Sequence, residues 1–185
     1  DKTARLIRQE VHQLDPGTVE VKTIHDIVAV KGTWTATYTV HADGRIEVDN
    51  QFTVFNRSLP EIPRMGMVMQ LGKDYTNMEY YGRGPWENYS DRKTSALISH
   101  NTGDVTKQEF LYVRPQENNY HTDVRWFALT DNEGTGLMVA GRPVFCTSAR
   151  NYAQELLDDG VKKDQRHLNE IVPADFVEWF IDYKQ

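Results

Sequence analysis

Apolar and polar residues alternate with period two along much of this chain, a pattern typical of β-strands. The clearest case is a pair of runs at residues 33–40 and 45–55. In the first run the apolar positions share one face: Trp34, Ala36, Tyr38 and Val40. Asp43-Gly44, between the two runs, is typical of a tight hairpin turn. We therefore predict an antiparallel hairpin here.

Further strands are expected where alternation or short apolar runs recur: 19–30, 65–71, 78–81, 94–99, 110–113, 123–129, 137–140, 144–148 and 176–183. In the last run, Glu178 and Asp182 fall among apolar residues, so one or the other is expected to need a partner. The methionines at 65, 67 and 69 alternate on one face, which favours a core-facing row.

Helical signals are sparse. Residues 151–157 predict one short helix, with Asn151 as its N-cap and Gly160 beyond its end. Residues 3–14 are polar and indicate a helical turn or the tail of a preceding segment. About ten strands, one helix and no alternation of strand with helix predict an all-β antiparallel sandwich. The strands do not recur at a fixed period, which disfavours a propeller or a solenoid.

Composition narrows the class of protein. The 185 residues suit one domain, residues 1–185, and 39% hydrophobic with 26% charged residues suits a globular fold. The formal charge is −6 and no basic stripe is present, which argues against nucleic-acid binding. No apolar run approaches 18 residues, so no membrane span is predicted. Cys146, the single cysteine, is expected to be a buried thiol. The first residue is not Met, and we expect a fragment of a longer protein.

Two stretches are dense in polar and aromatic residues: 82–92, which reads GRGPWENYSDR, and 114–121, which reads RPQENNYH. The first combines two glycines with a proline and predicts a shaped loop. Three carboxylates in these stretches would suit a glycosidase that uses a carboxylate pair: Glu87, Asp91 and Glu117. Each has an arginine near it in sequence, from the set Arg83, Arg92 and Arg114. Pairing with arginine lowers a carboxylate's pKa, so we favour a structural or substrate-binding role.

Histidine offers a second type of chemistry. His121 with Arg125, and His167 with Arg166, are candidates for acid–base catalysis or for contact with sugar hydroxyls, although a structural histidine with satisfied hydrogen bonds is the commoner outcome. The six histidines show no metal-ligand spacing, so no metal site is predicted. Aromatic residues gather around both dense stretches. Their rings suit sugar binding and a sandwich core equally well, and the sequence leaves both interpretations open.

The stretch 82–92 resembles the G-x-G-P-x-E-N-Y-x-D-R motif of the C-terminal small-chain domain of large bacterial β-galactosidases of glycoside hydrolase family 2. Further segments resemble that domain in the same order: 59–71, 112–118, Arg125-Trp126, a set made of Ser148, Tyr152, Gln154 and Leu156, then 166–168 and 180–182.

The resemblance implies the antiparallel supersandwich fold shared with galactose mutarotases. It implies a parent enzyme that hydrolyses β-galactosides such as lactose with retention, using two glutamates on a barrel domain outside this chain. No residue here is therefore assigned a catalytic role. Nine residues are expected to form a sugar-contact or structural network: Arg83, Glu87, Asn88, Asp91, Arg92, Glu117, His121, Arg125 and His167.

The resemblance also implies partners and cofactors. The partners would be the other domains of the parent enzyme, further copies of it in a homo-oligomer, and the β-galactoside substrate, with no nucleic acid or membrane. We expect no cofactor in this chain, and any Mg²⁺ or Na⁺ of the parent would bind through other domains. A bacterial source is implied, and cytoplasm and periplasm both stay open. A tryptophan that the family's domain lends to the active site would lie beyond Gln185.

Three hypotheses follow, in order of preference. The first is a non-catalytic fragment that acts as scaffold and active-site wall. The second is a mutarotase-like catalyst, with His121 or His167 as the acid and Glu87 or Glu117 as the base. The third is a carbohydrate-binding module that uses three aromatic residues: Trp86, Tyr89 and Trp126.

Overall fold

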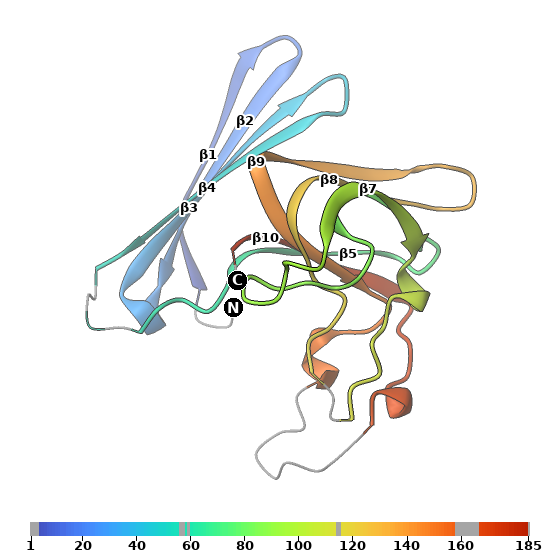
Figure 1. Cartoon of the computed structure of the whole chain (residues 1–185). Coiled ribbons are helices and arrows are strands. Elements are labelled where there is room, and N and C mark those ends of the chain that lie inside the picture. The colour runs from blue at the N-terminus through green and yellow to red at the C-terminus, as the bar shows by residue number, and fades with distance from the viewer. Residues whose placement is uncertain (1–3, 56–57, 59, 114–115, 158–166, 185) are drawn as a thin grey trace. The chain divides into compact units, whose positions relative to one another are not determined.

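The structure is a computed structural model that describes residues 4–55, 58, 60–113, 116–157 and 167–184. Almost all of its regular structure is β-strand, and the strands form two antiparallel sheets (Figure 1). The chain divides into two compact units, Asp1–Glu61 and Ile62–Gln185. The all-β antiparallel class predicted from the sequence is confirmed, with the two sheets that a sandwich requires. A single domain across residues 1–185 stays a prediction.

The first unit is a four-stranded meander in the order β1-β2-β3-β4. Its strands are β1 (Ala4–Asp15), β2 (Thr18–Ile27), β3 (Gly32–His41) and β4 (Ile46–Val54), and a 3₁₀ turn η1 (Val28–Val30) precedes β3. The predicted hairpin is confirmed as β3 and β4. Gly44 closes it at φ 89°, donating its N–H to the His41 carbonyl at 3.0 Å. Glycine suits this left-handed conformation because it has no Cβ.

Residues 3–14 do not form the helical turn or tail that their polarity indicated. Residues 4–15 are β1, which pairs with β2 from Ala4 opposite Ile27 to Asp15 opposite Thr18. The register shifts at Ile7 and at Leu14, so apolar side chains fall out of strict alternation. These irregularities and the edge position explain why period two is not visible in the sequence here.

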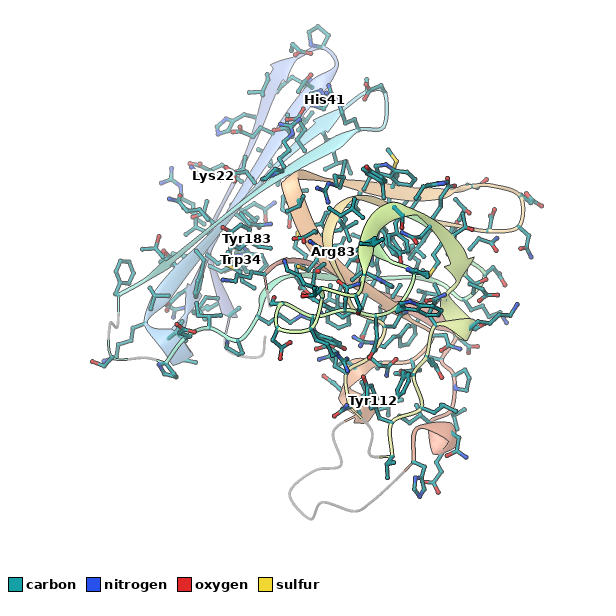
Figure 2. All side chains as sticks on the ribbon, viewed as in Figure 1. Lys22, Trp34, His41, Arg83, Tyr112 and Tyr183 are labelled. Carbon is teal, nitrogen blue, oxygen red and sulfur yellow. The ribbon has the colours of Figure 1, made fainter. Side chains whose placement is uncertain are left out.

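This sheet has one apolar face. Val21, Tyr38 and Val48 lie opposite one another across β2, β3 and β4, and the alternate positions of β3 carry a row of threonines. Trp34, on the apolar face, donates from Nε1 to Asn50 Oδ1 at 2.9 Å (Figure 2). Among the described residues of this unit, only three are buried: Ile27, Gly32 and Ala36.

The second unit is a six-stranded antiparallel sheet in the order β5-β10-β9-β8-β6-β7. Its strands are β5 (Met65–Gly72), β6 (Asn77–Gly84), β7 (Leu97–Asp104), β8 (His121–Thr130), β9 (Gly136–Arg150) and β10 (Phe176–Lys184). The runs 137–140 and 144–148, predicted as separate strands, form one strand, β9. Residues 100–104, predicted as a loop, extend β7, whereas 110–113, predicted as a strand, is irregular.

The core of this unit lies on one face of the sheet. Trp179, Tyr80, Phe127, Leu129 and Val177 are fully buried there. Met69 and Leu71 of β5 pack against this cluster, which confirms the core-facing methionine row. Cys146 on β9 is a buried free thiol, as predicted, and burial raises its pKa.

Only short 3₁₀ turns interrupt the strands of the second unit: η2 (Val105–Lys107), η3 (Gln154–Leu157) and η4 (Leu168–Glu170). The helix expected at residues 151–157 is therefore wrong in type and length. Asn151 does not cap η3, whose first N–H, that of Gln154, is instead satisfied by Glu178 Oε2 at 2.7 Å. Gly160 lies outside the described residues. No described helix is long or apolar enough to cross a bilayer.

Candidate functional site

The stretch 82–92 belongs partly to the sheet. Gly82, Arg83 and Gly84 are the last residues of β6, and only 85–92 leave it, so the prediction of a loop throughout was wrong. The strand continues because β8 lies against it. A Cβ on Gly82 would fall 2.8 Å from a methyl group of Val124. A cis peptide bond joins Gly84 to Pro85. Gly82 therefore allows β6 to pack closely against Val124 of β8.

Asn88 holds this loop to β8. Its side chain is 1% exposed, and Nδ2 donates to the carbonyls of Arg83 at 3.1 Å and Trp86 at 3.0 Å. Its Oδ1 accepts from the Thr122 N–H at 3.0 Å and hydroxyl at 2.6 Å. The Asn88 N–H donates to the Tyr120 carbonyl at 2.7 Å. Every polar atom of this amide is paired, so Asn88 fixes the backbone and has no donor left for a ligand.

Glu87 lies in a surface cluster. Its Oε1 accepts from Arg92 Nη2 at 2.8 Å and from the Tyr112 hydroxyl, and its Oε2 accepts from the Asn119 N–H at 2.9 Å. Arg92 also lies over the Tyr89 ring, 5.2 Å from its centroid. Figure 2 shows Tyr112 on the segment that precedes β8, so this cluster joins two loops. We call Glu87, Arg92 and Tyr112 the outer cluster.

Glu117 belongs to a second, more buried network. Arg64 donates from Nη1 to Glu117 Oε1 at 2.7 Å and from Nε to Asp182 Oδ2 at 2.8 Å. The Tyr120 hydroxyl also donates to Asp182 Oδ2, at 3.1 Å. Burial raises the pKa of Asp182, and Arg64 opposes that rise. Burial alone would lower the pKa of Arg64, but the bond to Asp182 raises it above its ordinary value.

Arg150 completes this network from β9. It is fully buried, lies 3.8 Å from Glu117, and donates from Nη2 to Gln154 Oε1 at 2.8 Å and from Nη1 to the Asn118 carbonyl at 3.1 Å. Burial lowers its pKa. We call Arg64, Glu117, Arg150 and Asp182 the inner network. The sequence indicated that Glu178 or Asp182 needs a partner, and both have one, but it did not identify Arg64 or Arg150.

Arg83 does not pair with Glu87 or Asp91. Its Nε donates to Asp123 Oδ2 at 2.5 Å, and Lys93 Nζ lies 3.1 Å from the same oxygen. The hydrogen bond from Arg83 holds the pKa of Asp123 below its ordinary value. Arg125 donates from Nη1 to the Asp123 carbonyl at 2.5 Å. The bond between Arg83 and Asp123 links the end of β6 to the start of β8, and Arg83 is labelled in Figure 2.

His121 is sealed inside the second unit, 1% exposed. Asn119 Nδ2 donates to the Ala149 carbonyl at 2.6 Å, which leaves Asn119 Oδ1 as the acceptor for His121 Nε2 at 3.1 Å. His121 Nδ1 therefore accepts from the Tyr80 hydroxyl at 3.2 Å. Burial lowers the pKa of His121 to about 4, so it is neutral at pH 7. With both nitrogens occupied, this imidazole cannot reach a substrate.

The remaining candidates do not join these clusters. Asp91 is exposed in the turn between Tyr89 and Arg92. His167 is exposed, and its Nδ1 lies 3.1 Å from the Val113 carbonyl, beside a pocket of about 430 Å³. Arg114 and Arg166, named with Glu117 and His167 in the sequence analysis, lie outside the described residues.

The three aromatic residues predicted to bind sugar are placed apart. Trp86 is 70% exposed beside the outer cluster, and Tyr89 stacks on Tyr120 with ring centroids 5.4 Å apart. Trp126 lies on β8 and contacts His100 at 5.8 Å between centroids.

This arrangement is suited to fixing two loops against a sheet. An acid catalyst in a glycosidase needs an accessible carboxyl group of raised pKa. Asp182, with its raised pKa, is 2% exposed and bound to Arg64. Glu87 and Glu117 each bind an arginine and are 12% and 17% exposed. Among the described residues, no three His, Cys, Asp or Glu side chains are grouped closely enough to hold a metal ion.

Comparison with known proteins places the chain in context. The family described as "Beta galactosidase small chain" matches residues 2–185. The "Beta-galactosidase" of Priestia megaterium is 34% identical over 149 residues, which are 80% of this chain and 14% of that protein.

Two further relatives also match most of this chain with a small part of their own length. "Beta-galactosidase BgaC" of Bifidobacterium adolescentis is 33% identical over 72% of this chain and 13% of its own length. The "Beta-galactosidase" of Streptococcus thermophilus is 30% identical over 88% of this chain and 16% of its own length. The chain thus spans only 13 to 16% of the length of these relatives.

Proposed function

Because the chain belongs to the β-galactosidase small-chain family, we propose that it is a non-catalytic β-domain of a retaining β-galactosidase. The whole enzyme would hydrolyse terminal β-D-galactosides such as lactose. Its other domains would supply the catalytic glutamates and bind any Mg²⁺ or Na⁺ that the enzyme needs. Those domains, further copies of the enzyme in a homo-oligomer, and the β-galactoside are the expected partners.

One observation carries the non-catalytic role: of the three candidate carboxylates, Glu87 and Glu117 are held by arginine, so the three do not supply a free pair. Retaining glycosidases need one carboxylate free to attack the sugar and a second able to give up a proton. Glu117 is bound by Arg64 at 2.7 Å and Glu87 by Arg92 at 2.8 Å. A carboxylate whose oxygen already binds a guanidinium is not free to attack a sugar.

The role that these contacts support is that of a scaffold. The loop 85–92 is attached to β8 through Asn88, and the segment that precedes β8 is attached to β9 and β10 through the inner network. Loops fixed in this way can hold a constant surface against a neighbouring domain. We propose that they form part of a wall beside the active site of the whole enzyme.

The sealed state of His121 argues against a mutarotase-like activity. A general acid must come within hydrogen-bond reach of the sugar oxygen, and both His121 nitrogens are bound inside the protein. His167 is exposed, but no described contact joins it to Glu87 or Glu117. A polarimetric assay on α-galactose should therefore show no acceleration by this chain.

The main test compares the chain with the enzyme that contains it. Pure chain 1–185 should not hydrolyse o-nitrophenyl β-D-galactoside, whereas the whole enzyme should. In the whole enzyme, Arg64→Met should lower the melting temperature while KM at low temperature stays unchanged. Clear turnover by the pure chain would contradict the non-catalytic role, and an inactive whole enzyme would contradict the assignment to a β-galactosidase.

A further inference from the structure

Three rings lie in one row on the face of the second unit's sheet opposite its core. Tyr81 on β6 is directly opposite His100 on β7 and Trp126 on β8. Residues directly opposite in an antiparallel sheet point to the same face. Tyr81 is 41% exposed and the His100 side chain 57% exposed, and Trp126 is half-buried. We call these three side chains the aromatic row.

Charged groups border the aromatic row and are held in place. His100 Nε2 lies 2.7 Å from Glu79 Oε1, and the Glu79 side chain is 54% exposed. The Arg125 guanidinium lies 5.9 Å from the centroid of the Tyr81 ring, and its bond to the Asp123 carbonyl orients it. A carboxylate thus lies beside the His100 ring, and a guanidinium lies over the face of the Tyr81 ring.

A polar pocket adjoins the aromatic row. It measures about 380 Å³, and its lining includes Asn77, Glu79, Thr102 and Thr130. Glu79 lies opposite Thr102 on β7 and Ala128 on β8, two residues along each strand from the aromatic row. Residues two apart in a strand are roughly 7 Å apart, so the pocket and the row are neighbours on one face. Glu79 belongs to both.

We propose that the aromatic row and this pocket together form a binding site for a neutral saccharide. The C–H face of one sugar ring stacks on Trp126, beside Tyr81 and its guanidinium neighbour Arg125, and hydroxyl groups of the next ring bond to Glu79 and Thr102. Aromatic side chains with a polar group at the edge suit ligands that have one apolar face and many hydroxyls.

The charges favour a saccharide over a protein partner. The centre of a protein interface is depleted in charged residues, because each buried charge must be desolvated and paired. A protein covering the aromatic row would bury Glu79 and Arg125 as well. Sugar hydroxyls both donate and accept, so they bond to a carboxylate and to a guanidinium without adding a charge.

The test uses the whole enzyme with its catalytic site filled by the inhibitor 1-deoxygalactonojirimycin. The probe is methyl 4-thio-β-lactoside, in which sulfur replaces the oxygen between galactose and glucose, so the bond resists hydrolysis. Its binding is observed by saturation-transfer NMR and by calorimetry. We expect the probe to bind with a millimolar dissociation constant even when the inhibitor fills the catalytic site. Trp126→Ala should weaken this binding about tenfold, a typical loss for a central aromatic contact. Tyr183→Ala is the matched control, because Tyr183 is an exposed aromatic residue on β10, three strands from β6, and its loss should leave binding unchanged.

Additional variants keep the test decisive. Trp126→Phe retains a ring and should keep most of the binding. If Trp126→Ala does not fold, Tyr81→Ala replaces it and should weaken binding severalfold. Absence of residual binding, or equal binding by wild type and by whichever of Trp126→Ala and Tyr81→Ala is tested, overturns the proposal. Inhibitor binding tests the proposed enzyme separately: failure of the inhibitor to bind contradicts the β-galactosidase assignment. In that case the comparison of probe binding between wild type and the alanine variant still decides the proposal for the aromatic row.

Discussion

The inner network and the outer cluster use the same chemistry in different surroundings. Each pairs arginine with carboxylate at hydrogen-bond distance. In the inner network Asp182 is 2% exposed and the Arg64 side chain 19%. In the outer cluster the Arg92 side chain is 57% exposed. The comparison distinguishes the inner network, whose contacts the folded state needs for stability, from the outer cluster, whose contacts contribute little to stability.

The two clusters should differ in their contribution to stability because water solvates and screens an exposed ion pair far more than a buried one. A buried charge that loses its partner keeps its full desolvation cost, and measured losses are about 3 to 5 kcal/mol. An exposed ion pair contributes about 0 to 1 kcal/mol, because water and salt screen it. Distances alone do not reveal this, since Arg64 and Arg92 both reach a glutamate within 2.8 Å.

Removal of Arg64 should have the largest effect. Arg64→Ala leaves Asp182 buried without its cation and removes a donor to Glu117, so we expect a loss of about 3 to 5 kcal/mol in the free energy of unfolding. Urea denaturation followed by tryptophan fluorescence measures it. The double variant Arg64→Met with Asp182→Leu should recover much of the loss. A loss below about 1 kcal/mol would show that the inner network is no different from the outer cluster.

His121, which is buried and neutral at pH 7, tests how a charge in the buried region affects the free energy of unfolding. The pKa of His121 is about 4 in the folded protein, against an ordinary value of 6.5. Between these values the unfolded chain binds a proton that the folded chain does not, so stability falls as pH decreases from about 6.5 to about 4. The stabilisation is complete above pH 6.5, and about 3 kcal/mol of it is linked to this proton.

The measurement is the free energy of unfolding at several pH values. His121→Gln keeps a donor and an acceptor but does not titrate, so its profile should be flatter than that of wild type between pH 4 and 6.5. Asp182, whose pKa burial raises, is present in both proteins and cancels in the difference. Parallel profiles would mean that the proton of His121 does not contribute.

Most of the strands were predictable from the sequence, and the exceptions have a physical cause. Strands with one buried face show period two, as β3 and β4 do. β1 is an edge strand whose residues are mostly exposed and whose register shifts at Ile7 and Leu14, so it has no such pattern. The 100–104 part of β7 is likewise at a sheet edge and polar. Edge strands bury less, and therefore constrain their sequence less.

The candidate site was predictable only where partners are close in sequence. Arg92 is five residues from Glu87, and proximity pointed to it. Arg64 is 53 residues from Glu117 and 118 from Asp182, and only the folded sheet brings them together. The sequence indicated that one of the two acidic residues in the last strand, of which Asp182 is one, needs a partner because the strand is apolar. It could not name the partner, since long-range pairing depends on strand order.

Asn88 should have an intermediate effect, because it is buried like the inner network but uncharged. Asn88→Ala leaves the Thr122 N–H and hydroxyl and two carbonyls without their partner, and we expect a loss of about 2 kcal/mol. Thr122→Val is the control: it removes only the hydroxyl donor to Asn88 Oδ1 and leaves the contacts of Nδ2 in place, so it should lose less than Asn88→Ala. A change within experimental error for Asn88→Ala would contradict the role assigned to this amide.

Arg92 should have the smallest effect, and its dependence on salt sharpens the comparison. In Arg92→Ala, Glu87 keeps its bonds from the Tyr112 hydroxyl and the Asn119 N–H, so the expected loss is about 0.5 kcal/mol. Because the guanidinium is exposed, 1 M NaCl should remove most of this difference between variant and wild type. The loss in Arg64→Ala should persist at that concentration, since salt screens buried pairs far less. Equal salt sensitivity of the two variants would mean that burial does not divide the two clusters as their exposed fractions indicate.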